Sequence, residues 1–314
     1  MTESAIVAEN LRKTFGEVVA VDHISLEVPR GSVLGLLGGN GAGKTTMVRM
    51  LTTVLRPDSG SGRVNGFDVH EHPQAVRRSI GLAGQFAAVD ENLTGRENLV
   101  LVGQLTHIGK ATAQRRADEL LDQFHLTDAG NRPVRTYSGG MRRRLDLGAA
   151  LVAHPPVLFL DEPTTGLDPA SRLDLWEVIE LLVSDGTTVL LTTQYLEEAD
   201  RLADNIVVID KGLIAAEGTA KQLKARLGDT VIEFELHDVA AATQAASLLG
   251  GTAAAGTIVR LVMANGPSTL RDALNQLSSA GITPVHVALR EPTLDDVFLT
   301  LTGTNSANAA SGAN

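Results

Sequence analysis

The 314-residue sequence contains no cysteine, carries an excess of negative charge and has no long run of strongly apolar residues. The absence of cysteine excludes disulfide bonds and thiolate metal sites, and it is compatible with a reducing cytoplasm. The formal net charge of −10 argues against a nucleic-acid-binding protein, because such proteins neutralise phosphates with basic residues. We therefore expect no nucleic-acid partner.

Neither a targeting segment nor a membrane span is predicted. The first ten residues, MTESAIVAEN, lack the basic start and apolar stretch of a signal peptide. The longest stretch without charge, residues 239–259, has the length of a span, but it is rich in Ala, Thr and Ser and contains Gly250 and Gly251. Because a glycine pair marks a turn, we interpret this stretch as helix, turn and strand.

What the sequence does have is a 43% hydrophobic composition and short apolar runs that alternate with helical patterns. Over the first two thirds, this alternation predicts an α/β fold with a mostly parallel sheet and crossover helices. The candidate strands are residues 33–38, 157–162, 188–193 and 205–210. The first three are apolar at consecutive positions, as expected for strands that are covered on both faces.

The pattern changes near residue 222. A Thr-x-x-Gln capping box at 219–222 begins a predicted helix that ends near Gly228. Residues 230–236 then alternate between apolar and polar, and helix-like and strand-like segments follow. We expect an N-terminal domain over 1–222, a small α+β domain over 229–303 and a disordered polar tail over 304–314.

The most specific motif is the glycine-rich sequence GGNGAGKTT, which matches G-x-x-x-x-G-K-[ST] between a predicted strand and a helical pattern. Glycines let backbone N–H groups converge on phosphate oxygens, and the helix N-terminus adds a favourable dipole. Lys44 is predicted to reach the β- and γ-phosphates, and the Thr45 hydroxyl to ligate Mg²⁺. The predicted phosphate-binding residues are Gly38, Gly39, Asn40, Gly41, Ala42, Gly43, Lys44, Thr45 and Thr46.

Two acidic residues end the predicted strand at 157–162. The carboxyl ends of such strands are where α/β sheets bind ligands. We expect Asp161 to hold Mg²⁺, directly or through water, and Glu162 to polarise the attacking water as a general base. These roles depend on the phosphate loop, since an apolar run that ends in Asp-Glu is otherwise a common strand terminus.

A second glycine pair narrows the possible class of phosphate-binding protein. Ser138, Gly139 and Gly140, within YSGGMRRRLDLGAAL, would expose backbone donors at a helix start, which is a second anion site. Two chains that face head to tail could each donate this segment to the other's γ-phosphate. Together with TTGLDP at 164–169, the motifs resemble those of the ATP-binding subunits of ABC transporters, over residues 5 to about 220.

The resemblance implies further assignments. The fold of that family adds an antiparallel β subdomain and a helical subdomain to the P-loop core. Phe15 matches an aromatic residue that stacks on adenine, Gln85 a glutamine that approaches Mg²⁺ and senses the membrane subunit, and Asp168 an aspartate that communicates across the dimer. The implied partners are a second copy of the chain and a separate transmembrane permease, at the cytoplasmic face of the cell membrane.

The sequence also departs from the family pattern. Tyr137 and Met141 replace Leu and Gln beside the Ser-Gly-Gly segment, and Gly39 replaces a proline. The largest departure is Gln194, where the family usually has a histidine that touches the γ-phosphate. Glutamine can donate a hydrogen bond but cannot become cationic or take a proton. We therefore predict a competent but slower ATPase.

Gln194 and the C-terminal motif EPTLDDVFLTLTG (291–303) resemble one branch, the ATPases of daunorubicin/doxorubicin-resistance exporters. This implies efflux of a hydrophobic drug, antibiotic or lipid. The same motif also predicts a capped amphipathic helix that docks through Leu294, Val297, Phe298 and Leu301. The alternatives are an ABC-type ATPase with a non-transport partner and a slow, regulatory ATP-binding protein.

Three other polar clusters are interpreted without a catalytic role. The arginines at 142–144 are expected on a solvated helix face, given the net charge. Thr192 and Thr193 are interpreted as the polar end of a strand. Glu197, Glu198 and Asp200 are interpreted as a solvated helix start, which acidic residues favour near the positive end of the dipole.

Overall fold

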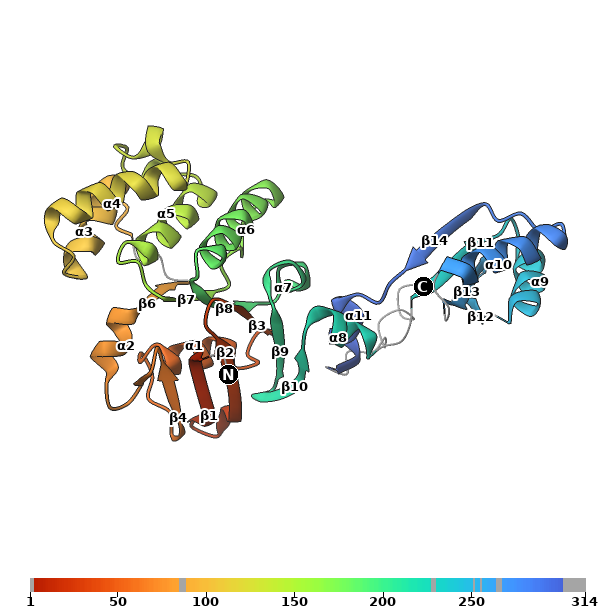
Figure 1. The fold of residues 1–314 in the computed structure, drawn as a ribbon, viewed down its shortest axis with the longest axis horizontal. Helices are drawn as coiled ribbons and strands as arrows, with labels where there is room; N and C mark the ends of the chain where they lie inside the picture. The colour runs from red at the N-terminus through yellow and green to blue at the C-terminus, as the bar shows by residue number, and fades with distance from the viewer. Residues whose placement is uncertain are drawn as a thin grey trace, which may run out of the picture. The chain divides into compact units, whose positions relative to one another are not determined.

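The computed structural model describes residues 3–84, 89–226, 230–250, 252–254, 256–263 and 267–301. The chain divides into two compact units, Met1–Ala220 and Lys221–Asn314, each with a hydrophobic core of its own (Figure 1). Within these described ranges, no helix is long and apolar enough to span a bilayer.

A six-stranded sheet lies at the centre of the first unit. Its strands, in spatial order, are β10 (Leu213–Gly218), β9 (Asn205–Asp210), β3 (Val33–Leu37), β8 (Thr188–Thr193), β7 (Val157–Asp161) and β6 (Ile80–Ala83). The strands from β9 to β6 are parallel, and β10 pairs antiparallel with β9. Every residue of β3, β7 and β8 is buried, which confirms the expectation that these strands are covered on both faces.

The two faces of this sheet belong to different cores, because successive side chains of a strand point to opposite faces. In β7, Val157 and Phe159 belong to a core that includes α1 (Lys44–Leu51). Leu158 and Leu160 belong to the other core, beneath a layer of helices. The continuous apolar run of β7 is thus two interleaved rows of core residues.

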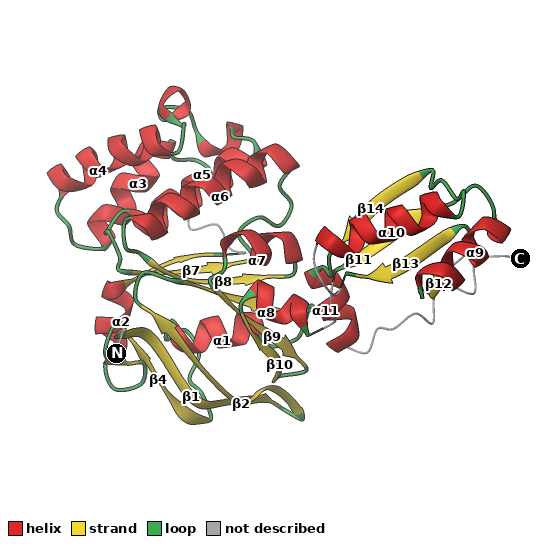
Figure 2. Cartoon of the chain, turned by 45° about the vertical axis from the view of Figure 1, so that its right-hand side comes forward, coloured by secondary structure: helices red, strands yellow, loops and turns green. Residues whose placement is uncertain are grey.

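An antiparallel sheet covers the first face. Its strands, in spatial order, are β2 (Val18–Pro29), β1 (Ser4–Phe15), β4 (Ser59–Val64) and β5 (Phe67–Asp68). Helix α1 packs between the two sheets, and Met47, Met50 and Leu51 are fully buried there (Figure 2). The short helix α2 (Pro73–Ser79) leads from this subdomain back to β6.

Helices cover the second face of the parallel sheet. They are α3 (Gly95–Leu105), α4 (Lys110–Gln123), α5 (Gly139–Leu151), α6 (Pro169–Ser184) and α7 (Leu196–Leu202), with 3₁₀ turns at Thr127–Ala129 and Val134–Thr136. Helix α3 begins with a complete capping box between Thr94 and Glu97, in which each side chain bonds the backbone N–H of the other residue. The antiparallel and helical subdomains that the resemblance implies are both present.

The second unit contains a four-stranded antiparallel sheet. Its strands, in spatial order, are β12 (Thr252–Ala254), β13 (Ile258–Val262), β11 (Val231–Glu235) and β14 (His286–Arg290). Ile232 and Phe234 of β11 pack against α9 (Val239–Leu249) and α10 (Pro267–Ser279). The described part of the uncharged stretch 239–259 therefore forms helix α9, which ends at the left-handed Gly250, strand β12 and the start of β13, as expected for helix, turn and strand, whereas Gly251 lies outside the described residues.

Two short helices complete this description. Helix α8 (Ala220–Ala225) begins directly after Thr219, as the capping motif predicts, whereas its predicted end near Gly228 lies outside the described residues. Helix α11 (Leu294–Leu301) is capped by Thr293, whose backbone N–H bonds the Asp296 carboxylate at 3.0 Å. Leu294 and Val297 are buried, while the side chain of Leu301 and the tail 304–314 are not described.

Candidate active site

Three parallel strands deliver the predicted site residues to one edge of the sheet. The register pairs Leu37 of β3 with Thr193 of β8, so the residues that follow, Gly38 and Gln194, leave the sheet side by side. Thr192 in turn pairs with Asp161, the last residue of β7. The phosphate loop, the two acidic residues and Gln194 therefore meet at the carboxyl ends of the strands, where such sheets bind ligands.

The phosphate loop needs glycine at specific positions. A Cβ on Gly38 would lie 2.4 Å from the Ile209 carbonyl oxygen, and one on Gly43 would lie 2.4 Å from that of Ala20. Gly41 and Gly43 also have φ values of 79° and 115°, which side-chain-bearing residues rarely adopt. Because Gly43 caps α1 without a side chain, the N–H groups of the first turn are left for an anionic ligand.

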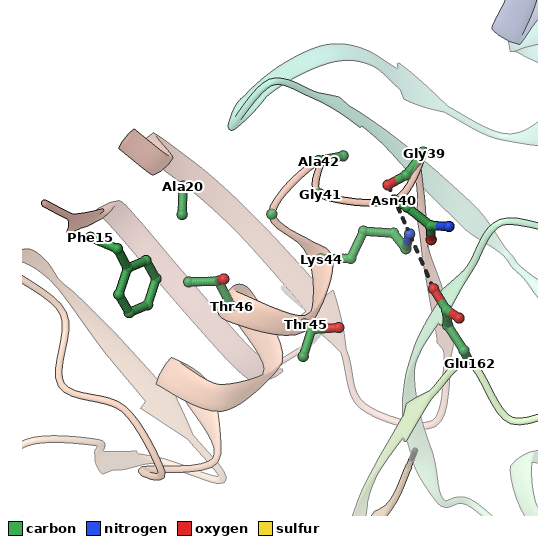
Figure 3. A pocket seen from close by; sticks show the side chains of 11 residues that line it. Phe15, Ala20, Gly39, Asn40, Gly41, Ala42, Lys44, Thr45, Thr46 and Glu162 are labelled. Carbon is green, nitrogen blue, oxygen red and sulfur yellow. Dashed lines mark hydrogen bonds and ion pairs between the residues drawn. The ribbon is translucent and has the colours of Figure 1, made fainter. Parts of the chain in front are cut away.

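Lys44 is buried at the centre of the loop. Its side chain is 4% exposed, and Nζ lies 3.4 Å from Glu162 Oε1. Nζ also donates hydrogen bonds to the carbonyl oxygens of Gly38 at 2.8 Å and Gly39 at 3.2 Å (Figure 3). The ammonium is thus held by the loop backbone on one side and by the predicted general base on the other.

The two predicted magnesium ligands are brought together. Thr45 Oγ1 donates a hydrogen bond to Asp161 Oδ1 at 3.2 Å, so a hydroxyl and a carboxylate share one position beside the phosphate loop. Hard divalent cations prefer oxygen ligands of this kind, and Mg²⁺ is usually bound through one or two protein groups together with phosphate oxygens. This donor set fits Mg²⁺. The third predicted ligand, Gln85, lies outside the described residues.

Thr192 holds both acidic residues, which sequence reasoning missed. Its hydroxyl donates to Asp161 Oδ1 at 2.5 Å and accepts the Glu162 N–H at 3.1 Å. The same N–H bonds the Thr192 carbonyl oxygen at 3.0 Å. The polar residue at the end of an apolar strand was the available signal, and its partner becomes visible only once β7 and β8 are paired.

Glu162 itself has an unusual backbone. Its φ of 53° is in the left-handed region, which is sparsely populated by residues other than glycine. Residues held there cost of order 1–3 kcal/mol and persist where the surroundings fix them, often at active sites. The Glu162 side chain is buried between Lys44 and the Thr165 hydroxyl, which donates to Oε2 at 3.3 Å.

The expectation of a solvated arginine face is wrong for Arg143. Its side chain is 15% exposed and points to the end of β7, where it bonds backbone carbonyl oxygens, whereas Arg142 reaches outward to Glu91. Burial lowers the pKa of the Arg143 guanidinium, and the nearby Asp146 carboxylate opposes that shift. The net charge of a protein says nothing about where one arginine of a helix points.

The expectation of a solvated start for α7 is wrong for Glu198. Glu197 and Asp200 are exposed, but Glu198 is fully buried and accepts a hydrogen bond from Trp176 Nε1 at 3.1 Å. Burial raises the pKa of the Glu198 carboxyl, because desolvation disfavours its charged form. Glu198 lies four residues after Gln194, and its bond to Trp176 links α7 to α6.

Gln194 is half-buried directly after β8. Among the residues that the structure describes, its amide has no hydrogen-bond partner, so both its donor and its acceptor remain for a ligand. Its contact to a γ-phosphate stays a prediction.

The Ser-Gly-Gly segment opens α5. Ser138 is the N-cap, and its Oγ accepts the Met141 N–H at 3.2 Å. Because this contact uses the backbone of Met141, it does not need the usual glutamine side chain. A Cβ on Gly140 would lie 2.7 Å from Ser171 Oγ, so glycine lets α5 approach the start of α6.

Two further residues that were compared with the family pattern, Asp168 and Tyr137, have hydrogen-bond partners within the chain. Asp168 caps α6 through the N–H and hydroxyl of Ser171, and these bonds lower the pKa of its carboxyl. Tyr137 is buried where the family has leucine, and its hydroxyl donates to the Ala129 carbonyl oxygen at 2.7 Å. The Ala129 carbonyl thus satisfies the extra polar atom that Tyr137 brings into the core.

A cleft of about 310 Å³ runs along the phosphate loop from Glu162 to Phe15 (Figure 3). Phe15 is 50% exposed at the end of β1, so its ring is free to stack on a planar ligand. Lys13 Nζ lies 5.8 Å from the ring centroid. The cleft thus offers an aromatic face at one end and a cationic, N–H-rich loop at the other, which suits a nucleoside triphosphate.

Comparison with known proteins identifies the family of the chain. The ABC transporter family matches residues 21–165. The daunorubicin resistance ATP-binding protein DrrA3 of Streptomyces coeruleorubidus is 52% identical over 307 residues, or 96% of this chain and 97% of that protein. The doxorubicin resistance ATP-binding protein DrrA of Mycobacterium tuberculosis is 49% identical over 311 residues, with coverage of 96% and 94%.

A solved structure gives the same assignment. An ATP-binding subunit of an ABC transporter superposes with a TM-score of 0.65 at 27% identity, over 71% of this chain and 93% of that one. The fold, the phosphate loop and the near-full-length relatives agree. The chain belongs to the ATP-binding proteins of the ABC transporter family, and it is an ATPase.

Proposed function

We propose that the chain is the ATP-hydrolysing subunit of an exporter that removes a hydrophobic drug, antibiotic or lipid through a separate membrane permease. The observation that carries this proposal is the identity of about half of all residues to drug-resistance proteins over nearly the whole chain, including the second unit. Those relatives are named for resistance to daunorubicin and doxorubicin.

Two copies of the chain are proposed to close head to tail around two ATP molecules. The phosphate loop and Lys44 of one copy would hold the triphosphate, and Ser138, Gly139 and Gly140 of the other would cover its γ-phosphate. Helix α5 supports this role because its N-terminus is capped by Ser138, and Gly139 has open space around its Cα. Asp168 would then couple the two ATP sites across the dimer interface.

Within each site, Glu162 would accept the proton of the attacking water, and Gln194 would orient that water or the γ-phosphate through its amide. Phe15 would stack on adenine. Thr45 and Asp161 would hold Mg²⁺, with Gln85 as a further ligand, and the ion would neutralise charge on the phosphates. Lys44 Nζ lies 3.4 Å from Glu162 Oε1, so a γ-phosphate bound by Lys44 would lie next to the general base.

The proposed partner implies a location and a domain plan. The permease would hold the ATPase at the cytoplasmic face of the cell membrane, as a peripheral subunit. The chain would comprise an ATP-binding domain over residues 1–222 and a small α+β domain over residues 229–303. The antiparallel sheet and two helices that pack around Phe234 support this assignment.

The experiment is efflux with matched variants. The chain is expressed with its permease in a drug-sensitive bacterium, and loss of daunorubicin from loaded cells is followed by its fluorescence. We expect faster efflux with the wild-type chain and none with Lys44→Met. Equal efflux from wild-type and Lys44→Met cells, at equal expression of both subunits, would contradict the proposal.

A further inference from the structure

The guanidinium of Arg143 lies at a junction of three backbone segments. It leaves α5 five residues after Ser138 and meets the end of β7. Its Nε donates to the Pro163 carbonyl oxygen at 2.5 Å, and its two terminal nitrogens donate to those of Gly84 at 2.5 Å and Glu162 at 2.9 Å. Asp146, 3.7 Å away on the same helix, provides the opposite charge.

These bonds complete the fixation of Glu162. Its N–H is held by Thr192, and its carbonyl oxygen is held by Arg143, so both peptide groups that flank its Cα have a partner. The backbone between these two bonds is the left-handed one, with φ of 53°. A residue in this region keeps its conformation only where its neighbours determine it, and that conformation sets the direction of the Glu162 side chain.

The same guanidinium links Glu162 to other parts of the site. Gly84 follows β6 and comes directly before Gln85 in the sequence, and a Cβ on Gly84 would lie 3.3 Å from Asp161 Cβ. Helix α5, which carries Arg143, begins at the Ser-Gly-Gly segment. One side chain therefore fixes the relative positions of the hydrolytic carboxylate, the residue before Gln85 and the helix that is proposed to cover the partner's ATP.

We propose that Arg143 is a positioning residue for ATP hydrolysis, which holds Glu162 in its hydrolytic orientation through the backbone of residues 162 and 163. The inference rests on the proposed role of Glu162 as general base. Arginine suits this task because its planar fork carries five donors in fixed directions, whereas a lysine ammonium is a single point on a flexible stem. Lysine can keep the charge here but cannot reproduce three divergent bonds.

The test compares Arg143→Gln and Arg143→Lys with Arg144→Gln as the matched control. Arg144 lies on the same helix and its side chain is 19% exposed, but its guanidinium lies 4.0 Å from Asp174 of α6. Affinity for a fluorescent ATP analogue, KM and kcat are measured on the purified full-length chain. Thermal melts report whether each variant is folded.

We expect kcat of Arg143→Gln to fall roughly 10- to 100-fold, as for small misplacements of a catalytic group. Affinity and KM should stay near the wild-type values, because the phosphate loop lies on β3 and α1 and contains none of these bonds. Arg143→Lys should lie between Arg143→Gln and the wild type. Arg144→Gln should keep the wild-type kcat.

A folded Arg143→Lys with the wild-type kcat would overturn the proposal, even if Arg143→Gln failed to fold. An equal loss of kcat in Arg144→Gln would overturn it too, because the effect would then belong to the helix. A uniform rise in KM with unchanged kcat would also contradict it. Failure of drug efflux with normal ATP hydrolysis would count against the proposed export function alone, since this comparison measures hydrolysis.

Discussion

Thr192 Oγ1 donates a hydrogen bond to Asp161 Oδ1 at 2.5 Å, and it accepts the N–H of Glu162 at 3.1 Å. One buried hydroxyl thus connects the proposed magnesium ligand with the proposed general base. The contact crosses two adjacent parallel strands, so it depends on their register and not on closeness in sequence.

Thr192→Val tests this contact. Valine has the same shape and suits a buried strand but cannot form either bond, so Asp161 would lose one of its two hydroxyl partners. A hydrogen bond to a charged group contributes about 1.5–3 kcal/mol, so we expect kcat to fall about tenfold or more and the Mg²⁺ concentration for half-maximal activity to rise.

Thr188→Val is the control for Thr192→Val. It removes another buried hydroxyl from β8, at the opposite end of the strand, where Thr188 accepts the Gly31 N–H at 2.9 Å. It should lower stability without changing the Mg²⁺ dependence. The same Mg²⁺ curve for wild type and Thr192→Val would show that the hydroxyl does not orient Asp161.

Substitutions at Gln194 test whether its free amide works on the γ-phosphate. In the presence of the permease, Gln194→Ala should reduce kcat about tenfold, which corresponds to the loss of roughly one hydrogen bond, ~1.4 kcal/mol. Gln194→His should raise kcat above the wild type, because it restores a group that can carry charge. If Gln194→Ala hydrolyses ATP as fast as the wild type, Gln194 has no such role.

The buried carboxyl of Glu198 makes stability depend on pH. Its pKa is raised on folding, so the neutral form is favoured in the folded state, and its contribution is fully present below the ordinary value of 4.5. That contribution is lost as pH rises through the folded pKa. Glu198→Gln removes this dependence, so its melting temperature relative to the wild type should increase as pH rises above 4.5.

Glu197→Gln provides the control for this pH series. Glu197 is the exposed neighbour on the same helix, and its substitution should leave the difference in melting temperature unchanged across the same pH range. A difference between Glu198→Gln and wild type that stays flat, or falls as pH rises, would contradict the buried-carboxyl account.

The sequence was sufficient to predict the strands at the centre of the fold. Their apolar runs are continuous because both faces are covered, and the motifs begin where these runs end. The phosphate loop follows β3, Asp161 ends β7 and Glu162 follows it, so local pattern and tertiary position coincide there. The positions of these residues at the strand ends were therefore predictable, while their roles stay predictions.

The direction of Arg143 and Glu198 was harder to predict. Three arginines in a row occupy three directions around a helix, and composition cannot say which one points inward. Helical spacing held a signal, because Arg143 is four residues before the buried Leu147, and Glu198 is four residues before the buried Leu202. Their partners, backbone carbonyl oxygens and Trp176, come from segments that meet only in the folded chain.

Glu162 is proposed as the general base that activates water for ATP hydrolysis, at a site between two copies of the chain. Glu162→Gln keeps the size of the side chain but cannot accept the proton, so turnover should fall by ~10²–10⁴-fold while ATP still binds. The most direct measurement is gel filtration of this variant with and without Mg-ATP. We expect a monomer alone and a stable dimer with ATP, and a chain that remains monomeric with ATP bound would contradict the account.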